Sequence, residues 1–212
     1  MFLQPATKSV KTIRVSKQLI FFIFALLSFR IIHKHDYNEN NAHFIKADSE
    51  HHFKSEYEEL RHLLFNLLDS PVKSTHHIGG TSHFNYPTEP ILDILVGVDN
   101  LHDITALDEK RLNYAGFYRL HHPYKKKVVM AKFNNLIDLK QEVRLHIIQR
   151  DTRLFKQYLE MDEALAHNDE IAQHFSDKKT QILKHVERIS DYEQRKQQVL
   201  DKIYKKYVAD SK

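Results

Sequence analysis

The sequence predicts an α+β fold in which a mostly β centre carries one early helix and a C-terminal helical layer. Three observations predict this class. Apolar residues between positions 53 and 68 recur at helical spacing, the run 91–98 is almost continuously apolar, and no glycine or proline follows Arg150. The chain has 212 residues, which leaves room for an appendage, because domains cluster at about 100 to 200 residues.

The early helix is expected to begin after Asp48 or Ser49, either of which suits an N-cap, and to end before Ser70 and Pro71. Its apolar positions are three or four residues apart and therefore form one stripe. These positions are Phe53, Tyr57, Leu60, Leu64, Leu67 and Leu68. The pattern is that of an amphipathic helix.

The centre of the chain has the pattern of strands joined by turns. Residues 72–78 form a candidate strand that ends at two glycines, and residues 91–98 (ILDILVGV) form a strand buried on both faces and interrupted by Asp93. Residues 101–115 are expected to be helical, with Gly116 as the glycine after the helix end. Three further strands are predicted at 117–121, 127–133 and 142–149.

The chain beyond Arg150 is expected to be helical, because it contains no helix breaker. Its apolar residues fall into three stripes at helical spacing. The stripes are Leu154, Tyr158, Met161 and Leu165; Ile171, Phe175, Ile182 and Val186; and Val199, Ile203 and Tyr207. These helices supply the C-terminal layer.

Residues 1–42 are predicted to be a basic and apolar tail with a polar linker, and residues 43–212 to be the domain. Four basic residues precede the apolar run 19–29, as in a signal peptide, but that run is short for a bilayer and no small-residue cleavage site follows. Three interpretations stay open: a secreted protein, membrane association through residues 8–32, or an extension without function. The expected location is the cytoplasm, with membrane contact through the tail as a further possibility.

The composition excludes several classes of function. There is no cysteine, so disulfide frameworks, cysteine-ligated zinc and thiol nucleophiles are excluded. The four glycines do not form a P-loop or a dinucleotide fingerprint. A net charge of +4, with acids and bases interleaved, gives no strong nucleic-acid stripe, and the lysine run 125–127 is interpreted as a solvated turn.

Two glycines after the first strand mark a candidate anion site. The backbone N–H groups of Gly79 and Gly80, together with the hydroxyls of Thr81 and Ser82, are suited to a phosphate. Asp93 interrupts an apolar strand, and a buried carboxylate needs a partner. The simpler interpretation is that the glycines only turn the chain and that Asp93 accepts hydrogen bonds from nearby groups.

This region resembles the GrpB family, whose pattern reads approximately HIGSTSVPGLxxKPIIDILV. The chain has His77-Ile78-Gly79-Gly80-Thr81-Ser82, followed in register by Pro90-Ile91-Leu92-Asp93-Ile94-Leu95-Val96. Arg144-Leu145-His146-Ile147 stands where the family usually has HLHV, and Tyr192 with Lys196 matches a Y-x3-K pair in the last helix. The resemblance covers about residues 43–208.

The resemblance implies a nucleotidyltransferase-like fold and a phosphorylated or nucleotide ligand. In some bacteria such a domain is fused to dephospho-CoA kinase, which connects the family with nucleotides or coenzyme A. Nucleotidyltransferases hold Mg²⁺ with carboxylates, so the resemblance implies Mg²⁺ as cofactor and Asp93 as the catalytic carboxylate. The ligand-binding residues are then His77, Gly79, Gly80, Thr81, Ser82, Arg144, His146, Tyr192 and Lys196.

Two departures from the family pattern bear on catalysis. Gly80 replaces the serine of the turn, and Leu95 stands two residues after Asp93, on the same strand face, where a second acid is expected. The sequence therefore predicts a domain that binds a phosphorylated small molecule or a nucleotide and shows little turnover. The alternative is an active Mg²⁺-dependent nucleotidyl- or phosphoryltransferase.

A metal set of two histidines and one carboxylate, His77, His146 and Asp93, is a further hypothesis. Alternatively, both histidines hydrogen-bond Asp93 and neutralise it. Arg144 shares a strand face with His146 and offers a fork for a phosphate or a carboxylate, unless it pairs with Asp93 or Glu89.

Overall fold

A computed structural model describes residues 44–49, 52–100, 102, 106–120, 126–135, 137–186 and 189–209. The predicted tail, residues 1–42, lies outside these ranges. Within them, no helix has the length and apolar character needed to cross a membrane.

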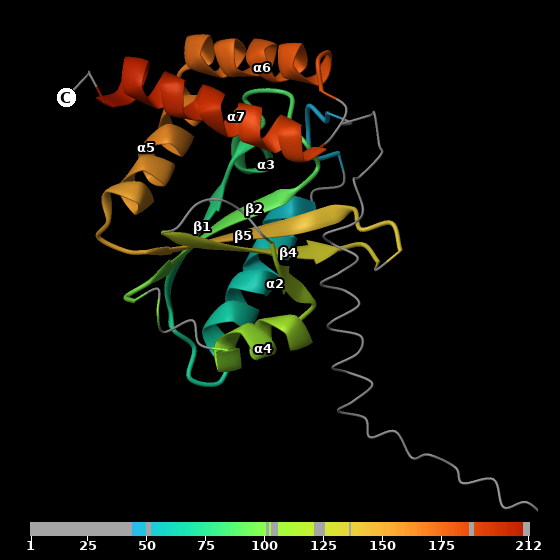
Figure 1. Ribbon diagram of the computed structural model, residues 1–212, viewed down its shortest axis with the longest axis vertical. Coiled ribbons are helices and arrows are strands. Elements are labelled where there is room, and N and C mark those ends of the chain that lie inside the picture. Colours follow the sequence, from blue (N-terminus) through green and yellow to red (C-terminus); the bar gives the residue numbers. More distant parts are fainter. Residues whose placement is uncertain are drawn as a thin grey trace, which may run out of the picture. The chain divides into compact units, whose positions relative to one another are not determined.

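Five strands form one mixed sheet in the order β1-β2-β5-β4-β3 (Figure 1). The central strands β2 and β5 are parallel, and the other pairs are antiparallel. The strands are β1 Val72–Ile78, β2 Leu92–Val98, β3 Phe117–Arg119, β4 Lys127–Phe133 and β5 Gln141–Gln149. All five predicted strands are therefore present.

Helices cover both faces of the sheet (Figure 1). The helices α2 (His52–Asn66) and α4 (Ala106–Tyr114) cover one face. The other face carries α5 (Arg153–His167), α6 (Asp169–Leu183) and α7 (Ile189–Ile203), which continues into the π-helix η2 (Tyr204–Ala209). A short helix, α3 (Gly80–His83), follows β1. The early helix and the C-terminal helical layer agree with the α+β prediction.

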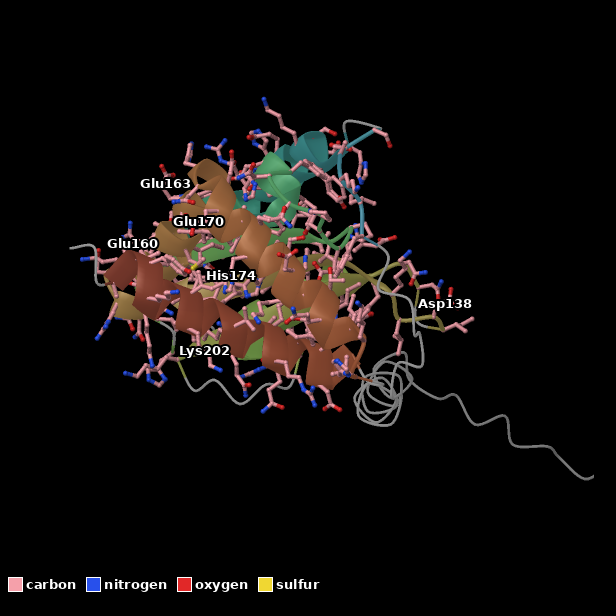
Figure 2. All side chains as sticks on the ribbon, turned by 90° about the horizontal axis from the view of Figure 1, so that it is seen from above. Asp138, Glu160, Glu163, Glu170, His174 and Lys202 are labelled. Atoms are coloured by element: carbon pink, nitrogen blue, oxygen red, sulfur yellow. The ribbon has the colours of Figure 1, made fainter. Side chains whose placement is uncertain are left out.

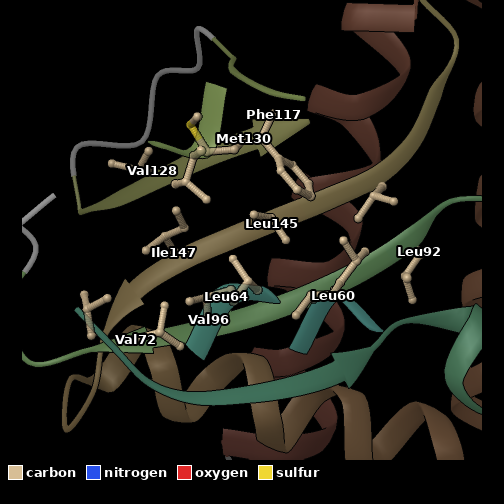
Figure 3. Close-up of a cluster of buried hydrophobic side chains, with 14 of the residues drawn as sticks. Leu60, Leu64, Val72, Leu92, Val96, Phe117, Val128, Met130, Leu145 and Ile147 are labelled. Carbon is tan, nitrogen blue, oxygen red and sulfur yellow. The ribbon is translucent and has the colours of Figure 1, made fainter. Parts of the chain in front are cut away.

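The face beneath α2 is the main hydrophobic core (Figure 3). Leu60 and Leu64 of α2 pack against Val96 of β2 and Leu145 of β5, and these side chains are buried. Alternate residues of a strand point to opposite faces, so Asp93, Leu95 and Gly97 face the other way. Only alternate residues of β2 therefore contribute to the core beneath α2.

The opposite face, beneath the C-terminal helices, is apolar in one region and polar in another. Leu95, Ile148 and Phe155 form an apolar cluster with Ile78. Toward the start of β2, Asp93 pairs in register with Arg144, so both side chains lie on this face. The polar region is where the predicted site residues gather.

Candidate functional site

Charged and hydrogen-bonding side chains connect the sheet with α6 and α7, and we call this set the polar layer. Its members come from the segment before β2, from β2, β4 and β5, and from α6 and α7. They are Glu89, Asp93, Lys127, Arg144, His146, Lys179, Tyr192, Glu193 and Lys196.

Asp93 and His146 meet on this face as the sequence predicts. His146 Nε2 lies 2.9 Å from Asp93 Oδ1, and the nearest guanidinium nitrogen of Arg144 lies 3.9 Å from the same oxygen. Burial opposes ionisation of Asp93, but Arg144 and the hydrogen bond from His146 hold its pKa below the ordinary value. Burial lowers the pKa of His146, so a neutral ring donates from Nε2 to an ionised carboxylate.

His77 does not join this pair. It pairs in register with Ile94, which places it on the α2 face, where its ring stacks on Tyr57 at 5.4 Å. Its Nε2 lies 3.1 Å from the Thr81 hydroxyl, and burial lowers its pKa to about 4. The predicted metal set of Asp93, His77 and His146 is therefore not formed. Over the described part of the chain, no group of three or more His, Asp or Glu side chains is arranged to hold a metal ion.

The glycine turn is engaged by groups of the chain itself. The Gly79 N–H donates to Asp162 Oδ1 at 2.6 Å. The hydroxyl of Ser82 donates to the Gly79 carbonyl at 2.7 Å, and that of Thr81 to the Ile91 carbonyl at 3.2 Å. A carboxylate oxygen from α5 thus takes one place that the sequence assigns to a phosphate. Sequence reasoning missed Asp162, because an acid in a charged helix gives no signal of its own.

The missing serine of the turn has a structural explanation. A Cβ built on Gly80 would overlap the side chain of Thr88, which is buried. Thr88 is held there by a two-residue bridge with Ile45, whose N–H and carbonyl bond its backbone at 2.8 and 2.9 Å. The threonine therefore occupies the space that a side chain at position 80 would need.

Arg144 is held by two partners besides Asp93. Its Nε and one terminal nitrogen donate to Gln141 Oε1 at 3.1 and 2.8 Å, and its terminal nitrogens reach Glu193 at 3.3 and 3.4 Å. Burial disfavours the charged form of Arg144, but Glu193 and Asp93 raise its pKa above the ordinary value. The contacts to Glu193 are longer than the 2.8 Å contact to Gln141, so Gln141 is the nearer partner of the fork.

Tyr192 and Lys196 face the polar layer, where both contact Glu89. The Tyr192 hydroxyl donates to Glu89, and Lys196 Nζ lies 3.2 Å from the same carboxylate. Lys179 Nζ lies 2.7 Å from its other oxygen. Burial opposes ionisation of Glu89, but Lys196 and Lys179 hold its pKa well below the ordinary value. At Tyr192 and Lys196, where the sequence predicts a ligand, the structure thus places a carboxylate of the chain itself.

Lys179 is the most deeply buried charge of the polar layer, with 1% of its surface exposed. Its ammonium also donates to the Pro87 carbonyl at 3.1 Å and lies 4.5 to 5.5 Å from the ring centroids of Phe44, Tyr86 and Phe175. Cation–π contacts of this kind favour a desolvated ammonium. The position of a lysine within the apolar stripe of α6 was the sequence signal that could have identified it.

Asp162 is expected to make the stability of the protein depend on pH. Burial raises its pKa to about 6, although the hydrogen bond from Gly79 opposes this, and Asp93 adds to the increase. A pKa raised in the folded state stabilises the fold below the unfolded value, near about 4, and this contribution is lost as the pH rises through about 6. Asp162→Asn keeps an acceptor for Gly79 but removes the charge.

We therefore expect the stability of Asp162→Asn, relative to the wild type, to increase between pH 4 and pH 7. Urea unfolding of both proteins at a series of pH values, without divalent cations, measures this difference. Parallel pH profiles for the two proteins would contradict the assignment.

A groove of about 210 Å³ lies on another side of the helical layer, between α6, α7 and η2. His174 and Lys202 border it (Figure 2). It contains no predicted site residue, because those on α7 point toward the sheet. The polar layer is therefore the candidate site.

Comparison with known proteins gives one family and one fold. A protein-family model described as GrpB protein matches residues 44–206. The glutamate-rich protein GrpB of Alkalihalophilus pseudofirmus is 26% identical over 166 residues, which are 77% of this chain and 95% of the relative. The crystal structure of the conserved protein GrpB from Enterococcus faecalis has a TM-score of 0.62 and 22% identity, covering 78% of this chain and 99% of that one.

A more distant match is the Cid1 poly(U) polymerase bound to MgATP. It has a TM-score of 0.41 and 15% identity, with 76% of this chain and 49% of the polymerase covered. The five-stranded mixed sheet and its helices agree with the α+β class predicted from the sequence, and the Enterococcus faecalis GrpB structure shares this fold.

Proposed function

Because the chain belongs to the GrpB family, we propose that its polar layer binds a phosphorylated small molecule or a nucleotide, with Mg²⁺ as the accompanying cation. The observation that carries this proposal is the arrangement of Asp93, Arg144 and His146 on one sheet face. It combines a carboxylate, a guanidinium fork and a neutral imidazole, which are the groups that a metal-bound phosphate needs.

Asp93 has the properties of a Mg²⁺ ligand. About a quarter of its side chain is exposed (25%), and its Oδ1 is held by His146. Its Oδ2 has no hydrogen bond within the described ranges and lies 3.5 Å from where a Cβ of Gly79 would stand. Mg²⁺ commonly takes only one or two carboxylates together with substrate phosphates and water, so a single prepared carboxylate fits this ion.

Asp162 supports the second candidate function, an active Mg²⁺-dependent nucleotidyl- or phosphoryltransferase. Leu95 is apolar and fully buried, so the strand supplies no second acid. However, Asp162 contacts the N–H of Gly79, and Asp93 lies against the same residue. The charge of Asp93 also contributes to the raised pKa of Asp162. A second carboxylate from α5, rather than from the strand, would complete a site for in-line transfer.

Titration calorimetry tests the binding proposal. ATP and precursors of coenzyme A are titrated into the full chain with and without Mg²⁺. We expect Mg²⁺ to strengthen binding of the wild type. In the presence of Mg²⁺, Asp93→Asn should bind with a Kd about tenfold higher or more, equivalent to about 1.4 kcal/mol. The isosteric asparagine retains an acceptor for His146, which keeps the local structure.

The matched control is Asp99→Asn, just after the end of the same strand. Asp99 pairs with Arg150 at the surface and lies away from the polar layer. Its binding should equal that of the wild type. Binding that is unchanged in Asp93→Asn, or absent for all these ligands, would contradict the proposal. Product analysis with Mg²⁺ and nucleoside triphosphates separates the two functions, since turnover lost in both Asp93→Asn and Asp162→Asn supports the enzyme.

The proposal also includes domain organisation and location. Residues 43–212 are the ligand-binding domain in the cytoplasm, and residues 8–32 contact the membrane. Fractionation of cells that express the full chain or residues 43–212 tests this, because only the full chain should sediment with membranes. If the two proteins were found in the membrane fraction in equal proportion, membrane contact through residues 8–32 would be contradicted.

A further inference from the structure

A buried lysine of the polar layer, Lys127, has no role in the site described so far. It is the first residue of β4, and 8% of its surface is exposed. It pairs in register with Ile148, and Val129, two residues later, pairs with His146. Because strand residues alternate, Lys127 lies on the same sheet face as Arg144 and His146.

The contacts of Lys127 connect it with Asp93. Its Nζ donates to the Tyr158 hydroxyl at 2.7 Å. The ring of Tyr158 lies 5.4 Å from that of His146, which in turn holds Asp93. Nδ1 of His146 is buried and has no hydrogen-bond partner in the described parts of the chain. The amine of Lys127, the phenol of Tyr158 and the imidazole of His146 are therefore successive neighbours in space, beside Asp93, the proposed Mg²⁺ ligand.

The electrostatic surroundings of the amine are unfavourable to its charge. Burial and then Arg144 lower the pKa of Lys127 to about 8, although Asp93, Glu193 and Asp201 oppose this decrease. Two cations that share a partly dry region repel each other unless an anion lies near both. Asp93 and Glu193 compensate part of this repulsion, and a further negatively charged group near both cations would stabilise them more.

We propose that Lys127, Tyr158 and Arg144 form an anion subsite that binds a phosphoryl group of the ligand beside Asp93. The subsite offers an ammonium, a phenolic hydroxyl and a guanidinium, which are the donors that bind phosphate oxygens in charge-assisted hydrogen bonds. This inference rests on the proposed function for the identity of the ligand. The subsite itself rests on the contacts of Lys127.

Pyridoxal 5′-phosphate is a suitable probe, because it carries a phosphate and an aldehyde on one small molecule. The neutral amine adds to the aldehyde and loses water to form an imine, which sodium borohydride reduces to a secondary amine. With the full chain at pH 8, we expect Lys127 to be labelled about tenfold faster by this probe than by pyridoxal, which lacks the phosphate. Peptide mass spectrometry measures each site.

Internal controls and variants make the result specific. The exposed lysines Lys73 and Lys140 should show no comparable preference for the phosphorylated probe. Lys127→Arg keeps the positive charge and removes the label, which verifies the peptide assignment. Tyr158→Phe removes one donor and should reduce the preference for the phosphorylated probe, while circular dichroism shows that the fold is retained. Equal labelling of Lys127 by both aldehydes, or no labelling, would overturn the subsite.

Protection by ATP and Mg²⁺ separates this inference from the proposed function. Preferential labelling that ATP suppresses supports both. Preferential labelling that ATP leaves unchanged supports the subsite and counts against a nucleotide as its ligand. Calorimetric binding of ATP that depends on Asp93, without preferential labelling of Lys127, overturns the subsite and leaves the proposed function intact.

Discussion

Replacing Glu89 with alanine is expected to lower the free energy of unfolding by about 3–5 kcal/mol, because it leaves a buried charge without its partner. Lys179 loses the carboxylate at 2.7 Å and, among the described residues, keeps the Pro87 carbonyl and three aromatic rings as its contacts. The buried hydroxyl of Tyr192 loses its acceptor as well. Lys196 is affected less, since Glu193 lies 2.8 Å away.

Chemical unfolding of Glu89→Ala and of a surface control measures this effect. Glu58→Ala breaks the exposed pair with Arg61 and should change stability by less than about 1 kcal/mol. The double variant Glu89→Ala with Lys179→Met removes both charges and should recover much of the lost stability. If Glu89→Ala were no less stable than Glu58→Ala, the inference that Glu89 stabilises the fold through the polar layer would be wrong.

Restoring the serine of the family pattern is expected to destabilise this chain. Gly80→Ser introduces a Cβ into the space that Thr88 fills, and overpacking of this kind costs about 1–3 kcal/mol. The loss should shrink when Thr88 is replaced by glycine in the same protein, because that substitution vacates the space. A double-mutant cycle of Gly80→Ser and Thr88→Gly, measured by thermal unfolding, gives the coupling between the two positions.

Additive effects in this cycle would show that position 80 tolerates a side chain. The predicted coupling also bears on function. In this chain, a serine at the turn would need a smaller residue at position 88, so the identities of Gly80 and Thr88 depend on each other. The absence of the serine is therefore explained by packing, independently of whether the protein has turnover.

Local patterns predicted the elements of the fold, because each leaves a periodic signal. The run 91–98 predicted a strand buried on both faces, and β2 has apolar residues beneath α2 and beneath the C-terminal helices. Gly79 and Gly80 marked the end of β1, where Gly79 has a φ of 79°. The strand order was not predictable, because the parallel pairing of β2 with β5 depends on contacts between distant segments.

The same limit applies to the site. The meeting of Asp93 with His146 agreed with the resemblance, and the shared face of Arg144 and His146 followed from the period of a strand. The face of His77 did not follow, because β1 shows no clean alternation of buried and exposed residues and its register was unknown. Asp162 could not be identified, since the rotation of a helix over a sheet is set by tertiary packing, whereas Lys179 had a signal in its position within the apolar stripe of α6.

The central parallel pair also determines when the protein can fold during synthesis. The paired residues Asp93 and Arg144 stand 51 positions apart, and β5 is the last strand to leave the ribosome. Until then, the nascent chain has β2 with one open apolar edge and β4 without its inner neighbour. Unpaired strand edges of this kind are prone to aggregate, and pairings distant in sequence form slowly. We therefore expect the growing chain to be most prone to aggregate in the interval between the emergence of β2 and that of β5.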